Sequence, residues 1–137
     1  MPVILLDNEA LSAIAFPKER GSAARRAQAV LDAAAQRKAP VRVSAATLVE
    51  AFRGKARDAG IERVLNRGIE VLPVDRGTAK VAGRLLTSAG LDSCSAIDAI
   101  VVATGIRLGA TLILTSDPDD LELLAVDHPA VQIEALT

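Results

Sequence analysis

Hydrophobic residues along this chain occur in short uninterrupted runs that alternate with longer segments of mixed character. The runs are rich in β-branched side chains, which favours buried strands over helix fragments. They cover Val3–Leu6, Val41–Val43, Ile69–Leu72, Thr111–Leu114 and, more weakly, Val131–Glu134. Near-continuous apolar strands are typical of a parallel sheet that is covered on both faces. The pattern therefore predicts an α/β fold with a central parallel sheet of four or five strands.

The segments between the predicted strands carry helix start and stop signals. Serine or aspartate stands where several helices would begin, and glycine follows two of their predicted ends. Helices are expected over residues 21–38, 44–52, 55–66, 75–88 and 95–108, and a further one begins at Pro118. No repeat, linker or low-complexity tract interrupts this alternation. We therefore expect a single domain over residues 1–137.

Length and composition agree with one soluble domain. The 137 residues suffice for one substantial core, and half of them are hydrophobic, which argues against disorder. No apolar run approaches the about 18 residues of a membrane span. The N-terminal run stops at Asp7, so it does not resemble a signal peptide. These features predict a cytoplasmic protein with no membrane association.

Charge and rare residue types narrow the functional classes further. Residues 1–84 carry a net charge of +6 and residues 85–137 one of −7, so one face can attract a polyanion while an acidic pocket holds metal. Phe16 and Phe52 are the only aromatic residues, which argues against a base-stacking platform. The single cysteine, Cys94, excludes an internal disulfide framework and a Cys-rich zinc site.

Four acidic residues occupy positions that packing explains poorly. Asp7 and Asp117 each follow a predicted strand, and ligands of parallel sheets bind at such strand ends. Glu50 and Asp98 interrupt apolar helical segments, where a buried carboxylate needs a charge partner or a metal. If the fold brings the four together, they form an oxygen-only site suited to Mg²⁺ or Mn²⁺.

Each of these acids also has a purely structural interpretation. Asp7 and Asp117 stand where a helix cap is expected. Asp98 follows Ser95 at the spacing of a capping box, and Glu50 can be read as an ordinary exposed helix residue. The functional interpretation depends on all four acids meeting in one place.

Four sequence segments carry a resemblance to a known family. They are LLDNEALSAI, SAATLVEAFRG, SAIDAIVVATGIRLG and ATLILTSDPDDL. In order and spacing they resemble the four motifs of PIN-domain ribonucleases, especially the small VapC-type toxins of bacterial toxin–antitoxin pairs, along essentially the whole chain. The resemblance implies a three-layer α/β/α sandwich and a metal-dependent endoribonuclease that leaves 5′-phosphate and 3′-hydroxyl ends.

The resemblance also implies roles for particular residues. The family's acidic quartet, which binds one or two Mg²⁺ or Mn²⁺ ions, is matched by Asp7, Glu50, Asp98 and Asp117. We expect the three aspartates to bind metal directly, and Glu50 to bind through water or to accept a proton. The hydroxyl residues that precede the fourth acid and orient it or a water are matched by Thr115 and Ser116.

Partners follow from the resemblance as well. Family members dimerise and are silenced by an antitoxin whose C-terminal segment wraps the toxin, often driving an arginine toward the acidic pocket. The substrate is RNA, for which basic side chains are expected to contact phosphates. The candidates are Arg20, Arg25, Arg26, Arg53, Lys55 and Arg57.

Several alternatives stay open. The sequence leaves open whether Asp119 or Asp120 joins the metal site beside Asp117, whereas His128 and Cys94 are expected to have no catalytic role. Haloacid-dehalogenase phosphatases want Asp-x-Asp after the first strand, and phospho-receiver domains want a lysine after the last one; the chain has neither. The serious alternative is a PIN-like module that binds RNA or a protein partner without cutting.

Overall fold

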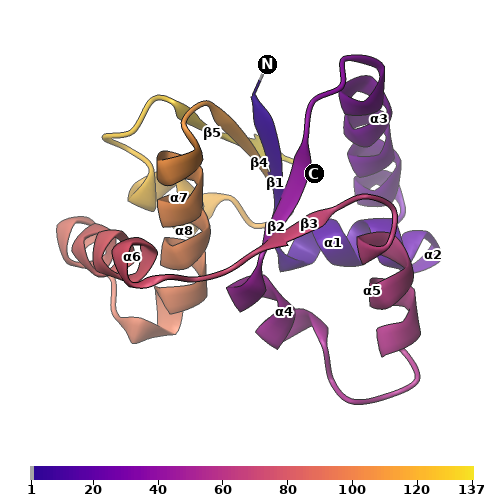
Figure 1. The fold of residues 1–137 in the computed structure, drawn as a ribbon, viewed down its shortest axis with the longest axis horizontal. Coiled ribbons are helices and arrows are strands. Elements are labelled where there is room, and N and C mark those ends of the chain that lie inside the picture. Colours follow the sequence, from indigo (N-terminus) through magenta and orange to yellow (C-terminus); the bar gives the residue numbers. More distant parts are fainter. Residues whose placement is uncertain (1) are drawn as a thin grey trace.

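Five parallel strands form the central sheet of the structure, a computed structural model that describes residues 2–137 (Figure 1). The strands are β1 (Val3–Leu6), β2 (Val41–Ser44), β3 (Glu70–Leu72), β4 (Thr111–Thr115) and β5 (Val131–Ala135). Their order in the sheet is β3-β2-β1-β4-β5, and every neighbouring pair is parallel. The predicted sheet is confirmed, including the weaker fifth strand.

Helices cover both faces of this sheet, which gives the expected α/β/α sandwich. One face carries α1 (Asn8–Ala15), α2 (Pro17–Arg20), α3 (Ser22–Gln36) and α5 (Asp58–Leu65). The other carries α6 (Arg76–Ala89), α7 (Ala96–Leu108) and α8 (Asp119–Leu124), with a short 3-10 turn, η1 (Ser93–Ser95), before α7. Helix α4 (Ala45–Ala51) follows β2 and packs against both α1 and α7. The two helical layers therefore meet at the carboxyl end of the sheet.

Alternate side chains of β1 divide the hydrophobic core into two halves. Ile4 and Leu6 pack with the helices of the α1 face, whereas Leu5 packs with α6, α7 and α8. All three are almost completely buried. Because each face of the strand is covered, β1 reads as a continuous apolar run.

Strand order reverses at the centre of the sheet. The chain runs outward from β1 through β2 to β3, and then crosses to the other side of β1 to form β4 and β5. Leu6 lies opposite Leu114, so β1 and β4 end at the same level. Ligand-binding crevices of open parallel sheets lie beyond the strand ends at such a switch in order. The residues that follow β1 and β4 border this crevice.

Helix starts differ from those expected at α2, α5 and α8. Helix α5 was expected from residue 55 and begins at Asp58. Helix α2 was not predicted; Pro17 begins it, because proline is favourable at a first helical position. Pro118 is the N-cap of α8 and not its first residue. Ser95 is the N-cap residue of α7, as expected, but its side chain accepts no capping hydrogen bond, so the capping box with Asp98 does not form. Its hydroxyl donates to Asp120 Oδ2 at 3.2 Å.

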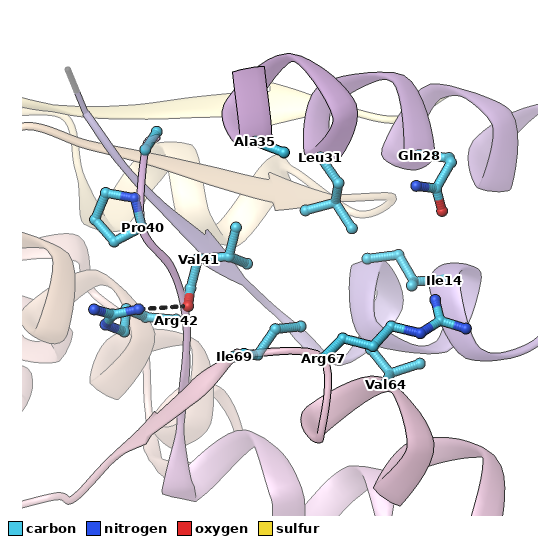
Figure 2. A pocket seen from close by; sticks show the side chains of 12 residues that line it. Ile14, Gln28, Leu31, Ala35, Pro40, Val41, Arg42, Val64, Arg67 and Ile69 are labelled. Atoms are coloured by element: carbon cyan, nitrogen blue, oxygen red, sulfur yellow. Dashed lines mark hydrogen bonds between the residues drawn. The ribbon is translucent and has the colours of Figure 1, made fainter. Parts of the chain in front are cut away.

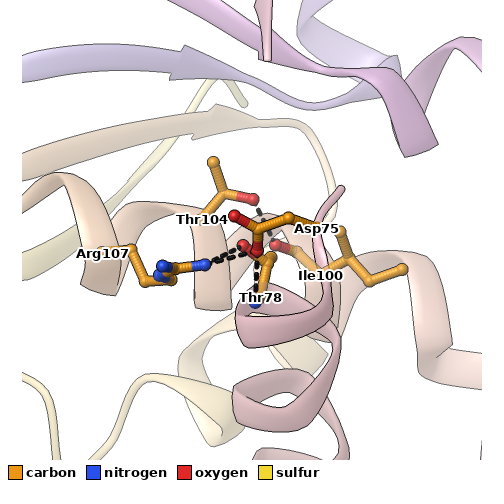
Figure 3. A network of polar contacts seen from close by, with 5 residues as sticks. All are labelled: Asp75, Thr78, Ile100, Thr104 and Arg107. Carbon is orange, nitrogen blue, oxygen red and sulfur yellow. Dashed lines mark hydrogen bonds and ion pairs between the residues drawn. The ribbon is translucent and has the colours of Figure 1, made fainter. Parts of the chain in front are cut away.

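A polar network joins the start of α6 to the end of α7 (Figure 3). Asp75 caps α6 by accepting a 2.8 Å hydrogen bond from the Thr78 N–H, and the Arg107 guanidinium donates to both the Asp75 carboxylate and the Thr78 hydroxyl. Arg107 also packs over Gly77, where an added Cβ would lie 2.7 Å from Nη1. The most C-terminal basic residue of the chain is therefore a structural link between two helices.

Within residues 2–137 no helix is long and apolar enough to cross a membrane.

Candidate active site

A pocket of about 130 Å³ opens at the carboxyl ends of β1 and β4, where the strand order reverses. Residues from four separate segments line it: Asp7, Asn8, Glu9, Thr47, Glu50, Ile97, Asp98, Val101 and Asp117. Oxygen-bearing side chains dominate this lining, and it contains no lysine or arginine. The fold therefore brings all four predicted acids to one pocket.

Asp7 is held at the floor of this pocket by the start of α1. Its Oδ1 accepts a 2.8 Å hydrogen bond from the Ala10 backbone N–H, so the residue also caps the helix. Asp7 is only 7% exposed. Burial raises the pKa of Asp7 to about 7, and the charges of Glu9 and Asp98 add to this rise, whereas hydrogen bonds from Thr115 and Ala10 oppose it. The fold thus disfavours the anionic form of Asp7, and nearby positive charge would favour it.

Asp98 projects from the first turn of α7 and is half-buried. Burial raises the pKa of Asp98 to about 6, and the charges of Glu50, Asp120 and Asp117 raise it further. Three acids from other segments therefore act electrostatically on this one carboxyl group. The pocket holds an excess of negative charge that a cation would relieve.

Helix α4 presents Thr47 and Glu50 to the pocket from the same face, since they lie three residues apart. Ser44 fixes the start of this helix, because its Oγ accepts a 3.2 Å hydrogen bond from the Ala46 N–H. Thr47 is 1% exposed, whereas Glu50 is exposed. The expectation that an apolar helix buries Glu50 is wrong: the outer side of α4 faces solvent, and Val49 there is 69% exposed. Glu50 lies at the rim of the pocket.

Asp117 reaches the pocket from the loop that follows β4. Its backbone N–H donates to the Thr115 hydroxyl at 2.9 Å, and Thr115 itself is completely buried. Pro118 takes the N-cap position of α8, so Asp117 does not cap that helix. The Ser116 hydroxyl oxygen is buried and has no hydrogen-bond partner among the described residues. The Thr115 hydroxyl thus holds the loop that carries Asp117.

The fit of this pocket to a divalent cation rests on its oxygen donors. Within residues 2–137 no group of three or more His, Cys, Asp or Glu side chains is gathered closely enough to hold a metal ion by itself. Two neutral oxygens of the same pocket, Asn8 Oδ1 and Thr47 Oγ1, are buried without a hydrogen-bond partner. Carboxylates and neutral oxygens together suit a hard, hydrated cation such as Mg²⁺. The residues present therefore fit such an ion.

A larger cavity of about 290 Å³ lies at the opposite end of the sheet (Figure 2). It is bordered by Pro40 and Val41 at the amino end of β2, by Ile69 before β3, and by Leu31 of α3. No acidic side chain lines it. This larger cavity therefore offers no carboxylate for binding a metal ion.

Comparison with protein-family models decides the classification. The model of the PIN domain matches residues 4–127, a segment that contains all four pocket acids. The chain belongs to the PIN domain family. A search of curated protein sequences finds no significant match to this PIN domain.

Solved structures with the same fold include chains of two complexes. This PIN domain resembles a chain of a toxin–antitoxin complex from Klebsiella pneumoniae at 20% identity and a TM-score of 0.65, with 93% of this chain and 94% of that chain covered. It also resembles a chain of VapBC2 from Rickettsia felis bound to a DNA fragment from its promoter. That match has 14% identity and a TM-score of 0.67, and it covers 97% of this chain and 98% of that chain. At these identities the likeness is one of fold.

Sequence analysis did not single out three of the pocket's polar residues, Asn8, Glu9 and Thr47. Asn8 directly follows Asp7, and Thr47 precedes Glu50 by three residues, so their positions in the pocket were open to inference from the acids. That Asn8 and Thr47 are buried without a hydrogen-bond partner could not be inferred from the sequence, because it depends on packing between α1, α4 and α7. Asp120, one of the two residues left open beside Asp117, acts on Asp98 by its charge.

None of the six basic residues proposed to contact RNA lines the acidic pocket. Arg20 comes near it, because its Nη1 lies 2.7 Å from Oε2 of Glu9, which does line the pocket. Arg57 pairs with Glu19 at 2.9 Å and lies 3.6 Å from the centroid of the Phe16 ring. The remaining four are exposed: Arg25, Arg26, Arg53 and Lys55. Contact of these residues with RNA stays a prediction.

Proposed function

We propose that this PIN domain is a metal-dependent endoribonuclease that hydrolyses RNA phosphodiester bonds. The observation that carries the proposal is the meeting of Asp7, Glu50, Asp98 and Asp117 in one pocket at the switch in strand order. The four carboxylates come from four segments, and no lysine or arginine lines the pocket to neutralise their charge. Burial and mutual repulsion already raise the pKa of Asp7 and of Asp98. Such an arrangement is costly for the fold unless a cation occupies it.

A Mg²⁺ or Mn²⁺ ion would be held by Asp7, Asp98 and Asp117. Bound there, it supplies positive charge opposite the phosphate oxygens and lowers the pKa of water. The chain itself contributes rigid placement: Asp7 is fixed by its hydrogen bond to the first turn of α1, and Asp117 by the bond of its N–H to Thr115. Ser116 is expected to assist by orienting Asp117 or a water.

Glu50 has a different role from the three aspartates. It is exposed at the rim of the pocket, beside the space into which a phosphodiester would enter. From there its carboxylate can accept the proton of the attacking water. The water oxygen bonds to phosphorus, the bond from phosphorus to the 3′ oxygen breaks, and that oxygen takes a proton from solvent. The products are a 5′-phosphate and a 3′-hydroxyl end.

Basic side chains outside the pocket would hold the RNA backbone. Net charge of +6 over residues 1–84 favours a polyanion on the side of the molecule built from that part of the chain. The proposed contacts are Arg20, Arg25, Arg26, Arg53, Lys55 and Arg57. Arg20 is of special interest, because its present partner, Glu9, belongs to the pocket lining.

The biological setting that fits best is a type II toxin–antitoxin pair. The sequence resembles VapC-type toxins, and two chains that share the fold come from a toxin–antitoxin complex and a VapBC complex. We therefore propose a cognate antitoxin protein as partner, a homodimer as the assembly and the cytoplasm as the location. Copurification with the product of a neighbouring gene would test the partnership.

The alternative is a PIN-like module that binds RNA or protein without cutting. A purely binding module has no need of four acids in one pocket, and this favours the enzyme. The deciding experiment incubates purified protein with total cellular RNA and either Mg²⁺ or Mn²⁺, with EDTA and the Asp98→Asn variant as controls.

Discrete products that require the metal and the Asp98 carboxylate would support the ribonuclease, and sequencing of their ends would identify the substrate. The expected ends are 5′-phosphates. Folded protein, free of antitoxin, that leaves RNA intact and binds no divalent ion would favour the binding module.

A further inference from the structure

Thr47 is a buried polar residue whose hydroxyl the fold does not use. The residue is 1% exposed, and its Oγ1 has no hydrogen-bond partner among the described residues. A buried hydroxyl without a partner costs free energy, because it has lost its bonds to water. Such a hydroxyl is expected to form its hydrogen bond with a bound ligand that is not part of the protein chain.

Other threonines in helices of this protein do not share this property. Thr104 Oγ1 donates to the Ile100 carbonyl at 2.7 Å, and Thr87 Oγ1 donates to the Gly83 carbonyl at 3.3 Å. Both bonds reach back four residues within the helix. Thr47 stands in the first turn of α4, so the residue four positions earlier belongs to β2 and offers no helical carbonyl. Its hydroxyl is left to face the pocket.

A second neutral oxygen faces the same pocket. Asn8 Oδ1 is buried without a partner among the described residues, and Asn8 belongs to α1, whereas Thr47 belongs to α4. The two oxygens thus approach from different elements. Both can accept hydrogen bonds, and the pocket that they border is lined by acidic side chains and by no lysine or arginine. A ligand that donates hydrogen bonds and carries positive charge fits this lining best.

The size of the pocket narrows the ligand further. Its volume is about 130 Å³, and the described acids are not gathered closely enough to hold a bare ion by themselves. Each water molecule takes up about 30 Å³, so the space admits a cation together with several waters. Mg²⁺ gives up its waters reluctantly and is typically bound with several of them in place.

From these observations we propose that the Thr47 hydroxyl and the Asn8 carboxamide oxygen accept hydrogen bonds from the water shell of a divalent ion in this pocket. The two are positioning residues that hold a hydrated ion against Asp7 and Asp98 and need not touch the metal. This inference rests on the proposed metal dependence. It adds that affinity for Mg²⁺ depends on neutral oxygens as well as on carboxylates.

The test measures Mg²⁺ binding by calorimetry, without RNA, for the wild-type protein and three variants. Thr47→Val removes the hydroxyl at nearly constant shape, and Thr47→Ser keeps it. Thr104→Val is the matched control, because the Thr104 hydroxyl is in a helix and already has a hydrogen-bond partner, the Ile100 carbonyl. We expect Thr47→Val to weaken Mg²⁺ binding about tenfold, with Thr47→Ser and Thr104→Val within about twofold of wild type.

Two further measurements separate this role from a structural one. In EDTA the melting temperature of Thr47→Val should equal or exceed that of wild type, because the substitution removes an unsatisfied buried group. Hexaamminecobalt(III), which keeps its six ammonia ligands and offers only N–H donors, should compete with Mg²⁺ in the wild-type protein and compete less well in Thr47→Val and Asn8→Ala.

The outcomes distinguish this inference from the function on which it rests. Wild-type protein that binds no divalent ion would refute both. Wild-type binding of Mg²⁺ with unchanged affinity in Thr47→Val would overturn this inference alone. A Thr47→Val variant that binds Mg²⁺ normally but needs more RNA for half-maximal cleavage would assign the hydroxyl to the substrate, which also overturns it.

Discussion

Asp7 and Asp98 share one pocket so closely that, after burial, the charge of Asp98 is among the causes of the raised pKa of Asp7. Asp7 directly follows β1 and Asp98 lies in the first turn of α7, and the chain between them builds most of the molecule. Their repulsion is therefore a property of the folded state alone. In the absence of a cation the fold tolerates this site at a cost in stability.

The first prediction concerns this cost. The pKa of Asp7 rises from 3.8 to about 7 on folding, so between these values the folded chain holds a proton that the unfolded chain has released. The contribution of Asp7 to stability consequently falls as the pH rises from about 4 to about 7, and it is lowest above that range. Asn keeps the helix cap but carries no charge.

In EDTA and above pH 7, Asp7→Asn should raise the free energy of unfolding by about 1–3 kcal/mol. The advantage should shrink as the pH falls toward 4 and vanish well below 3.8, where Asp7 is protonated in both states. Urea unfolding at the two pH values measures it, with Asp32→Asn, an exposed change on α3, as control. An Asp7→Asn protein less stable than wild type at high pH would contradict a destabilising carboxylate.

The layout of the fold was predictable because the strands are apolar on both faces. β1 and β4 lie at the centre of the sheet, and each appears in the sequence as a run of Val, Ile, Leu or Thr that ends near an acid. Helix α2 escaped prediction because it is a single turn between Phe16 and Gly21, too short for any periodic pattern.

The candidate site was predictable only in part. The four acids stood out by their position after strands or within apolar helices, and the fold brings them together. The exposure of Glu50 was missed, because sequence cannot show which side of a short helix lacks a covering layer. Thr47 and Asn8 were missed because their hydrogen-bond state depends on contacts between elements far apart in the chain.

The second prediction concerns the ion pair between α6 and α7. Hydrogen bonds with Thr78, and after them the hydrogen bond and charge of Arg107, hold the pKa of Asp75 below its ordinary value, against an opposing effect of desolvation. The stabilising contribution of Asp75 is thus present at neutral pH and lost as the pH falls through its lowered pKa.

A double-mutant cycle with Asp75→Asn and Arg107→Met measures this pair. Each single variant should lower the melting temperature by a few degrees, and the double variant should lose less than the sum, because both singles break the same contact. The coupling should vanish in acid. Cleavage per folded molecule should stay at the wild-type rate, since neither residue lines the acidic pocket. Additive losses would show that the two side chains act independently.

The third prediction tests Arg20 as a phosphate contact. Its guanidinium is paired with Glu9 at the border of the pocket, and RNA would offer a competing anion. In an Asp98→Asn background, which leaves RNA uncut, Arg20→Gln should weaken binding of single-stranded RNA. It should also reduce the slope of log affinity against log salt by about 0.7.

Arg37→Gln is the matched control. Arg37 is exposed and lies between the end of α3 and the amino end of β2, whereas the pocket lies at the carboxyl ends of the strands. Its salt slope should equal that of the Asp98→Asn parent. An unchanged slope for Arg20→Gln would mean that Arg20 stays with Glu9 when RNA binds, and would leave phosphate contact to other residues.

The last prediction decides among the three aspartates that follow β4. Asp117 lines the pocket, Asp119 is exposed on α8 and lies outside its lining, and Asp120 acts on Asp98 by its charge while accepting the Ser95 hydroxyl. Asp117→Asn should lower metal-dependent cleavage at least about a hundredfold, because loss of a direct ligand should exceed the effect of losing an outer partner. Asp119→Asn should stay within about twofold of wild type, as an exposed change. The loss of cleavage in Asp120→Asn should fall between these two. Asn can still accept the hydrogen bond of the Ser95 hydroxyl, but the substitution removes a charge near Asp98. Equal losses in Asp117→Asn and Asp119→Asn would instead require the loop after β4 to rearrange when metal binds, with Asp119 turned into the site.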